Sequence, residues 1–189
     1  AGCRDFHSDH AVRSDRVIFL RHPVTDAPEG MCYGRSDVGL GHEAPSQIEA
    51  ALMALPTVGS ILCSPARRCR LLAERFVQRD GASLRFDERL WEHDFGDWEG
   101  RLWSDIPRAE SEAWMEDLWN NASPGGERYR DVVKRVGDAL ADADDGDVVI
   151  CHAGVIRAAQ ILIEGRSFDE VFAIKVPFAT PIRIARKAA

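Results

Sequence analysis

The sequence predicts an α/β fold: a three-layer α/β/α sandwich with a mostly parallel central sheet. Short apolar runs typical of buried strands alternate with longer segments of helical periodicity, and the turns between them are short. With 189 residues, 45% of them hydrophobic, the chain can bury one substantial core. We therefore expect a single domain over residues 16–189, preceded by a polar, flexible tail over residues 1–15.

Strands are predicted where apolar residues stand together between turn signals. Val17 to Arg21 is a run of this kind, and Pro23 prevents its simple continuation in the centre of a sheet. The runs that begin at Ser60 and at Val148 are equally apolar and also end just before polar residues. The predicted strands are 17–21, 60–64, 84–86, 148–151, 171–176 and 181–185.

Helices are predicted from apolar residues that repeat on one face. Ile48, Leu52 and Leu55 share such a face, and Pro56 ends that helix. Pro65 suits the first turn of the next helix. The predicted helices are 44–55, 65–78, one or two within 102–120, 130–143 and 154–164. The glycine-rich segment 29–41 and the aromatic segment 90–100 are predicted to be ordered loops.

Composition narrows the range of functions. A net charge of −7 argues against a nucleic-acid surface, which needs an excess of Lys and Arg on one face. No apolar stretch approaches the roughly 18 residues of a membrane span, and the polar N-terminus lacks the apolar core of a secretory signal. Five cysteines without CxxC spacing indicate buried, reduced thiols. We expect a soluble, cytoplasmic protein without nucleic-acid or membrane partners.

Two metal-site readings of the sequence are unconvincing. Cys3, His7 and His10 are not followed by a second ligand pair at zinc-finger spacing. The acidic segment 142–147 resembles a calcium loop only superficially, because Gly146 and Ala153 stand where ligands are needed. We therefore expect no metal.

Four stretches near the ends of apolar runs carry the candidate chemistry. Because the carboxyl ends of parallel strands converge on one crevice, their polar residues are expected to meet there. The stretches are Arg21-His22, Ser64-Pro65-Ala66-Arg67-Arg68, the loop Leu90 to Gly100 with Glu92, and His152-Ala153-Gly154-Val155-Ile156-Arg157.

Two imidazoles, two guanidiniums and a carboxylic acid suit phosphoryl transfer through a histidine. His22 is the candidate nucleophile, since a neutral imidazole attacks without prior deprotonation. Arg21, Arg68 and His152 would neutralise the phosphoryl oxygens. Glu92 would protonate the leaving group and later activate water. This scheme requires neither metal nor cofactor.

Each of these residues also has an ordinary explanation. Arg21-His22 alone is typical of a surface turn, Ser64-Pro65 of helix capping, and His152 of a satisfied core histidine. The aromatic residues Phe95, Trp98, Trp103, Trp114 and Trp119 suit packing better than ligand stacking. The joint occurrence of the motifs favours the catalytic interpretation.

Together, the four stretches resemble the histidine phosphatase superfamily, the group related to phosphoglycerate mutase, from about Val17 to Ile184. The resemblance implies a phosphoglycerate mutase-like fold. It also implies that His22 becomes phosphorylated, that Arg68 and His152 bind the phosphoryl group, and that Glu92 is the acid.

Arg-His-Pro, with Pro23 where the family most often has glycine, and the loop Gly30 to Asp37 look like a bacterial branch of α-ribazole phosphatases. That likeness implies hydrolysis of α-ribazole 5'-phosphate or cobalamin 5'-phosphate in nucleotide-loop assembly. Cys32, Tyr33, Arg35 and Gly154 are the residues then expected to bind this small phosphorylated substrate.

Three alternatives stay open at this point. The chain could encode a general small-molecule phosphatase, a phosphoglycerate mutase-type enzyme, or a non-catalytic protein that binds a phosphorylated ligand on the same fold. A homodimer is also left open by the sequence.

Overall fold

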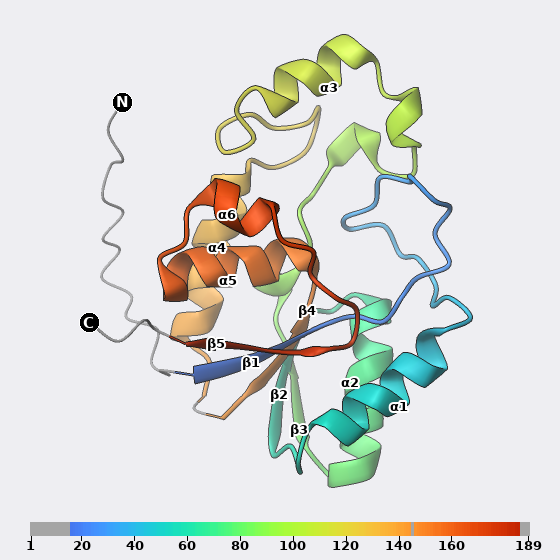
Figure 1. Cartoon of the computed structure of the whole chain (residues 1–189), viewed down its shortest axis with the longest axis vertical. Coiled ribbons are helices and arrows are strands. Elements are labelled where there is room, and N and C mark those ends of the chain that lie inside the picture. Colours follow the sequence, from blue (N-terminus) through green and yellow to red (C-terminus); the bar gives the residue numbers. More distant parts are fainter. Residues whose placement is uncertain (1–15, 145, 186–189) are drawn as a thin grey trace.

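The computed structural model describes residues 16–144 and 146–185, and its central feature is one five-stranded sheet (Figure 1). The strand order is β3-β2-β4-β1-β5. Strand β5 runs antiparallel to β1, whereas the other neighbours pair in parallel. The strands are β1 (Arg16–Arg21), β2 (Ser60–Cys63), β3 (Ser83–Phe86), β4 (Val148–Cys151) and β5 (Pro181–Ala185).

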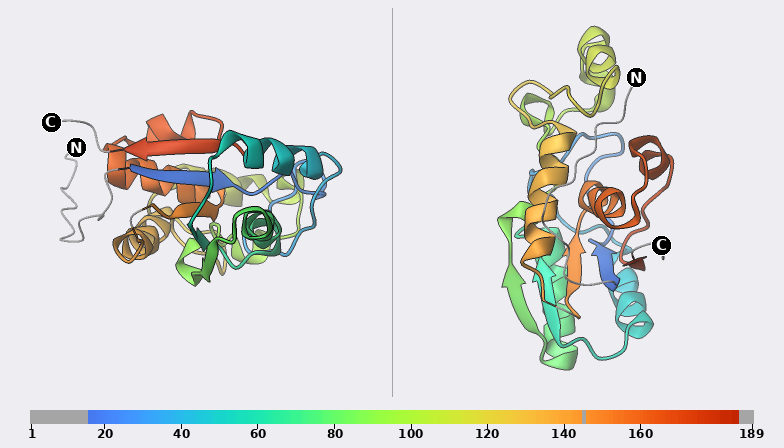
Figure 2. Two further views of the ribbon diagram at one scale, coloured as in Figure 1. Left: turned by 90° about the horizontal axis from the view of Figure 1, so that it is seen from below. Right: turned by 90° about the vertical axis from the view of Figure 1, so that its left-hand side faces the viewer.

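The helices lie mainly in two layers that cover the faces of this sheet (Figure 2). In Figure 1 and in the right-hand view of Figure 2, α3 lies beyond one end of the sheet. The helices are α1 (Ala44–Ala54), α2 (Arg67–Asp80), α3 (Arg108–Met115), α4 (Tyr129–Ala141), α5 (Ala153–Glu164) and α6 (Phe168–Phe172), with short 3-10 turns at Glu88–Leu90, Gly96–Trp98 and Trp103–Asp105.

Alternate residues of β1 pack against opposite helix layers. Val17 and Phe19 belong to the core that β1 and β4 form with α4 and α5. Ile18 and Leu20 pack into the core with α1 and α2. Successive side chains of a strand point to opposite faces, so a strand that is apolar throughout needs both layers. The predicted three-layer α/β class, with its mostly parallel sheet, is confirmed.

The prediction of a strand over 171–176 is wrong, because residues 171 and 172 complete α6 and residues 173–176 belong to no helix or strand. The Ser167 hydroxyl accepts a hydrogen bond from the Glu170 N–H, and the Glu170 carboxylate accepts one from the Ser167 N–H. This capping box satisfies backbone donors that a helix start otherwise leaves unpaired. The rings of Phe168 and Phe172, one helical turn apart, stack with centroids 4.3 Å apart. Local capping and packing therefore override the β-propensity of the segment.

Helix α2 begins two residues later than predicted. Pro65 lies outside the helix, and Ala66 has an extended backbone with ψ of 132°. The residue before this turn is Ser64, whose hydroxyl lies 2.8 Å from Nε2 of His152.

An aromatic cluster connects the region around α3 to the loop before α1. Trp98 and Cys32 are almost fully buried in it, with Phe95 and Trp114 packed alongside. The ring of Trp103 lies 5.8 Å from that of Trp114, centroid to centroid. These side chains pack mainly on one another, as the sequence indicated.

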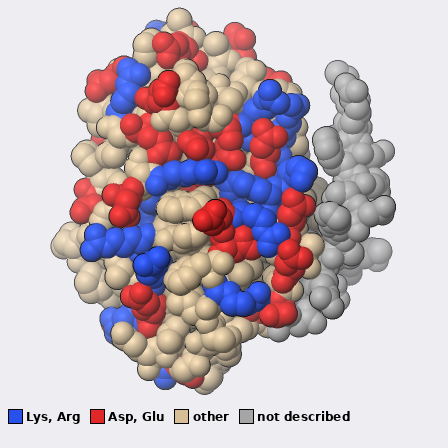
Figure 3. All heavy atoms as spheres, turned by 180° about the vertical axis from the view of Figure 1, so that it is seen from behind, with Lys and Arg blue, Asp and Glu red and all other residues tan. Residues whose placement is uncertain are grey.

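Several further sequence expectations concern the surface and the thiols. Cys32, Cys63, Cys69 and Cys151 are free and buried, as predicted. The expected tail over 1–15, with Cys3, His7 and His10, lies outside the described residues. Within the described ranges, every helix is too short or too polar to cross a bilayer. On the face in Figure 3, basic and acidic side chains lie beside one another.

Replacing Ser167 by alanine tests the capping of α6. Ser167→Ala removes the acceptor of the Glu170 N–H and should lower the free energy of unfolding by about 1 kcal/mol. Urea unfolding at neutral pH measures the change. Ser111→Ala is the control, because that exposed hydroxyl only bonds back to a carbonyl within α3 and its loss should cost less than about 0.5 kcal/mol. Equal effects of the two changes would contradict the assigned cap.

Candidate active site

Three neighbouring strands end in polar residues that stand side by side. Strand β4 lies between β2 and β1, and the residues after these strands are His152, Ser64 and His22. The sheet ladder continues past the strand ends: the His22 N–H donates to Cys151 O, and the Ser64 N–H donates to Ile150 O, each at 2.9 Å. The two imidazole centroids are 5.3 Å apart. The strand ends thus place both histidines in one site, where sequence analysis expected them.

His22 is buried with one ring nitrogen committed to the backbone. Its Nδ1 lies 2.7 Å from the carbonyl oxygen of Pro23, which can only accept, so the proton resides on Nδ1 and the lone pair on Nε2. Burial, and then the positive charges of Arg68 and Arg21, lower the pKa of His22 well below its ordinary value. Proline at position 23 removes an N–H but retains the carbonyl that fixes this tautomer.

His152 is fully buried and held between two side chains. An Arg68 guanidinium nitrogen lies 3.3 Å from Nδ1 and can only donate, so Nδ1 accepts and Nε2 carries the proton. Nε2 lies 2.8 Å from the Ser64 hydroxyl, to which it donates. Burial, and next the positive charge of Arg68, lower the pKa of His152 well below its ordinary value.

Sequence analysis missed the part that Ser64 plays, since Ser-Pro was interpreted as helix capping. Its position was the available signal: it follows β2 as His22 follows β1 and His152 follows β4.

Arg68 is 1% exposed, although it carries a charge. Its Nη1 donates to Ser36 O at 2.8 Å, and its Nη2 donates to Gly34 O at 2.5 Å. Its buried Nε–H has no hydrogen-bond partner among the described residues. A buried cation with an unused donor is suited to an entering anion.

Arg21 is held from the other side of the site. Its Nη1 donates to Val176 O at 2.9 Å, and its guanidinium carbon lies 3.8 Å from the centroid of the Phe178 ring. Burial lowers the pKa of this guanidinium, but arginine remains charged at neutral pH. Its buried Nε, like that of Arg68, has no partner in the described part of the chain. The site therefore offers two unused N–H donors of a kind that bind phosphate.

Glu92 is held by backbone N–H groups. The N–H of Gly154 lies 3.1 Å from each carboxylate oxygen, and the His93 N–H lies 2.9 Å from one of them. A Cβ at position 154 would come within 2.2 Å of the Glu92 Oε1, so only glycine permits this approach. Gly154, which was expected to bind substrate, donates its N–H to the Glu92 carboxylate.

Arg135 and Glu127 support the loop that carries Glu92, and neither was among the predicted site residues. Arg135 donates to the carbonyl oxygens of Trp91 at 2.6 Å and Glu92 at 3.1 Å. Its guanidinium also pairs with the Glu127 carboxylate at 2.7 Å. Glu127 ends the segment Pro124-Gly125-Gly126-Glu127, which also resembles the α-ribazole phosphatase branch, whereas Arg135 belongs to no motif that indicates chemistry.

The other three residues expected to bind substrate lie in different surroundings. Tyr33 is within the site, with its ring centroid 5.5 Å from the Arg68 guanidinium carbon. Arg35 is 43% exposed and faces Asp94 at 3.5 Å. The expectation that Cys32 binds substrate is corrected, because Cys32 is 1% exposed and its side chain packs in the aromatic cluster. Its backbone N–H and carbonyl bond to Arg101 and Gly100.

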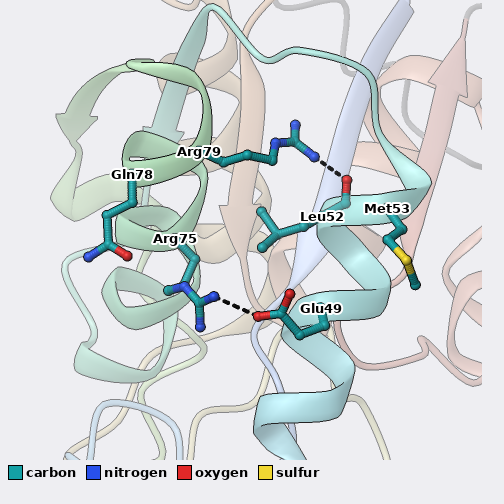
Figure 4. Close-up of a pocket in the computed structure, with 6 residues that line it drawn as sticks. All are labelled: Glu49, Leu52, Met53, Arg75, Gln78 and Arg79. Carbon is teal, nitrogen blue, oxygen red and sulfur yellow. Dashed lines mark hydrogen bonds and ion pairs between the residues drawn. The ribbon is translucent and has the colours of Figure 1, made fainter.

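A surface hollow of about 470 Å³ lies elsewhere, between α1 and α2 (Figure 4). Arg75 pairs there with Glu49 at 2.6 Å, and Arg79 bonds to the carbonyl oxygen of Leu52. These groups brace the two helices, so the hollow is not the candidate active site. Among the described residues, no three His, Cys, Asp or Glu side chains are grouped to hold a metal ion.

Comparison with known proteins gives a consistent picture. The family model described as "Histidine phosphatase superfamily (branch 1)" matches residues 17–187. A glucosyl-3-phosphoglycerate phosphatase of Mycobacterium tuberculosis is 33% identical over an alignment of 168 residues, and the alignment covers 78% of this chain and 74% of that protein.

Two solved structures share the fold. A mycobacterial glucosyl-3-phosphoglycerate phosphatase superposes with a TM-score of 0.76 at 28% identity, over 89% of both chains. The α-ribazole phosphatase of Shigella flexneri superposes with a TM-score of 0.80 at 21% identity, also over 89% of both chains.

The buried neutral histidines make stability depend on pH. In the unfolded chain His22 and His152 take up protons near their ordinary pKa of about 6.5, whereas in the folded protein the pKa of both is well below that value. The free energy of unfolding should therefore fall as pH is lowered from 7 to 5, with a slope approaching about 1.4 kcal/mol per pH unit for each histidine. Urea unfolding at several pH values measures this slope.

His22→Asn should remove one histidine's share of the slope. His42→Asn, which changes an exposed imidazole, is the matched control and should keep the slope of the unmodified protein. An unchanged slope in His22→Asn would show that this imidazole does not resist protonation in the folded state.

Proposed function

The chain belongs to branch 1 of the histidine phosphatase superfamily, and from this premise we propose that it hydrolyses phosphate monoesters through a phosphorylated His22. The observation that carries the proposal is the pair of imidazoles 5.3 Å apart, flanked by Arg21 and Arg68 with their unpaired Nε–H groups. Relatives named as phosphatases support the same class of reaction.

In the first half-reaction, the lone pair on the His22 Nε2 attacks phosphorus and the ester P–O bond breaks. The Pro23 carbonyl holds the proton on Nδ1 and so keeps Nε2 unprotonated for attack. The low pKa of His22 keeps the imidazole neutral at pH 7. Glu92 in its protonated form gives its proton to the leaving alkoxide.

In the second half-reaction, water attacks phosphorus and the P–N bond breaks. The Glu92 carboxylate accepts a proton from this water, which releases inorganic phosphate and restores His22. Arg21 and Arg68 neutralise the phosphoryl oxygens in both steps, where burial strengthens each charge-assisted bond. A bound dianion also opposes the causes that lower the pKa of His152, and this favours a protonated His152 as a further donor.

For the substrate, we propose α-ribazole 5'-phosphate, or cobalamin 5'-phosphate, in nucleotide-loop assembly. The motif Arg21-His22-Pro23 and the loop at residues 30–37 support this choice. Arg35 already faces the carboxylates of Asp94 and Glu127, which compensate its charge and so weaken its attraction for the carboxylate of a glycerate leaving group.

Glucosyl-3-phosphoglycerate is the second candidate substrate. The observation in its favour is the 33% identity to the mycobacterial phosphatase named for it. A comparison of kcat/KM for both esters and for 3-phosphoglycerate, with EDTA present, decides between the candidates and also tests a mutase-type preference.

Trapping of the phosphorylated enzyme tests the mechanism. Rapid quenching with a labelled phosphomonoester should give an acid-labile, alkali-stable label on His22, because phosphorus bound to imidazole nitrogen has this stability. His22→Ala should abolish the label and His42→Ala should retain it. Label that persists without His22, or a folded protein that never acquires label, would refute the proposal.

Gly154→Ala tests the assignment of Glu92. The new Cβ would lie 2.2 Å from the Glu92 Oε1 and so displace the carboxylate, while stability should change by less than about 1 kcal/mol, because the side chain can move and alanine favours a helix. We expect kcat on alkyl phosphates to fall about 100-fold, and on aryl phosphates much less, because aryl leaving groups need little protonation.

Gly137→Ala in α4 is the matched helical control, since its Cβ would meet only ordinary contacts at 3.6 Å, and it should keep full activity. Equal losses on alkyl and aryl esters in Gly154→Ala would rule out the acid role of Glu92.

A further inference from the structure

Resting on the function proposed above, we propose that Glu99 is a positioning residue for phosphate binding. Its carboxylate fixes the loop at residues 34–36, and the carbonyl groups of that loop fix the guanidinium of Arg68. Glu99 itself does not touch the phosphate.

The Glu99 carboxylate gathers four donors from two segments of the chain. Oε1 accepts from the N–H of Arg35 at 2.8 Å and of Phe95 at 3.2 Å. Oε2 accepts from the Ser36 N–H at 2.6 Å and from the Ser36 hydroxyl. Burial alone would raise the pKa of Glu99, but these hydrogen bonds outweigh it and lower that pKa. The carboxylate is therefore ionised at neutral pH and binds the loop with charge-assisted bonds.

The same loop supplies both carbonyl groups that orient Arg68. Gly34 O and Ser36 O accept from its two terminal nitrogens, and they flank Arg35, whose N–H is bound to Glu99. The loop thus presents its donors to one side chain and its acceptors to another. With both Nη groups engaged in this way, the direction of the unpaired Nε–H of Arg68 is set by the loop.

The loop has little freedom to find another position. A Cβ at Gly34 would lie 1.8 Å from the backbone oxygen of His93, so the chain passes directly against the loop that carries Glu92. The Cys32 carbonyl accepts from the Gly100 N–H, and the Cys32 N–H donates to Arg101 O, each at 2.8 Å. Glu99 lies between these contacts. Its carboxylate joins the loop at residues 34–36, which binds Arg68, to the segment that contains Glu92.

Glu99→Gln tests the proposal with almost no change of shape. An amide oxygen accepts as before, but the NH₂ group faces donors and leaves some of them unpaired. We expect the Kd for inorganic phosphate, measured by titration calorimetry, to rise at least tenfold, and KM for a phosphomonoester to rise with it. Asp80→Asn is the matched control: Asp80 also binds a backbone N–H and an arginine, but at the far end of α2, and its loss should leave the Kd unchanged.

A double variant distinguishes positioning from a general loss of structure. If Glu99 acts through Arg68, Glu99→Gln should weaken phosphate binding much less in an Arg68→Met background than in the unmodified protein. Should Glu99→Gln fail to fold, Ser36→Ala removes only the hydroxyl donor and should raise the Kd in the same direction by about twofold to fivefold.

Wild-type affinity in the folded Glu99→Gln variant, or equal losses in both backgrounds, would overturn this inference and leave the proposed function intact. If the unmodified protein binds phosphate but forms no phosphohistidine, the proposed function fails. The positioning role of Glu99 is then still decided by the Kd for phosphate of the Glu99→Gln variant.

Discussion

The site depends on one constraint: the guanidinium groups of Arg21 and Arg68 are held among buried groups near the strand ends. The Nε–H of each has no acceptor among the described residues. Removing a cation from water is costly unless its donors are paired. Here the terminal nitrogens of Arg68 and one of Arg21 bind carbonyl oxygens, which stabilise the guanidinium groups without neutralising their charge. The remaining charge and donors favour an anion with several oxygens.

The histidines respond to the same constraint. Burial beside two arginines keeps both imidazoles neutral, and their neighbours then decide which nitrogen bears the proton. A backbone carbonyl decides it for His22, whereas Arg68 and Ser64 together decide it for His152. His22 keeps a lone pair on Nε2 that is able to attack, whereas both ring nitrogens of His152 are hydrogen-bonded to Arg68 and Ser64.

Close backbone approaches bring the remaining groups to this point. At Gly34 and Gly154, a side chain would collide with the loop of Glu92 or with its carboxylate. Arg135 and Glu99 then hold the approaching loops by their backbone groups. Side chains that hydrogen-bond to backbone have no identity that suggests chemistry, and for this reason the sequence motifs point to the candidate reacting groups and not to the residues that support them. Ser64 was passed over for a related reason, since a serine before a proline has a common local explanation.

The sequence by itself determined the α/β class and five of the six predicted strands, and it indicated the candidate set of two histidines, two arginines and one glutamate, because strand composition and motif chemistry are local properties of the chain. The capping box that replaces the start of the strand predicted over 171–176 is a local contact of Ser167 with Glu170, which the sequence also contains. The tertiary structure decided that Cys32 packs away in the aromatic cluster and that the Gly154 N–H binds Glu92. These outcomes depend on which distant segments meet. Residues such as Gly154 and Glu92, 62 positions apart, become partners only when the sheet and its loops are assembled.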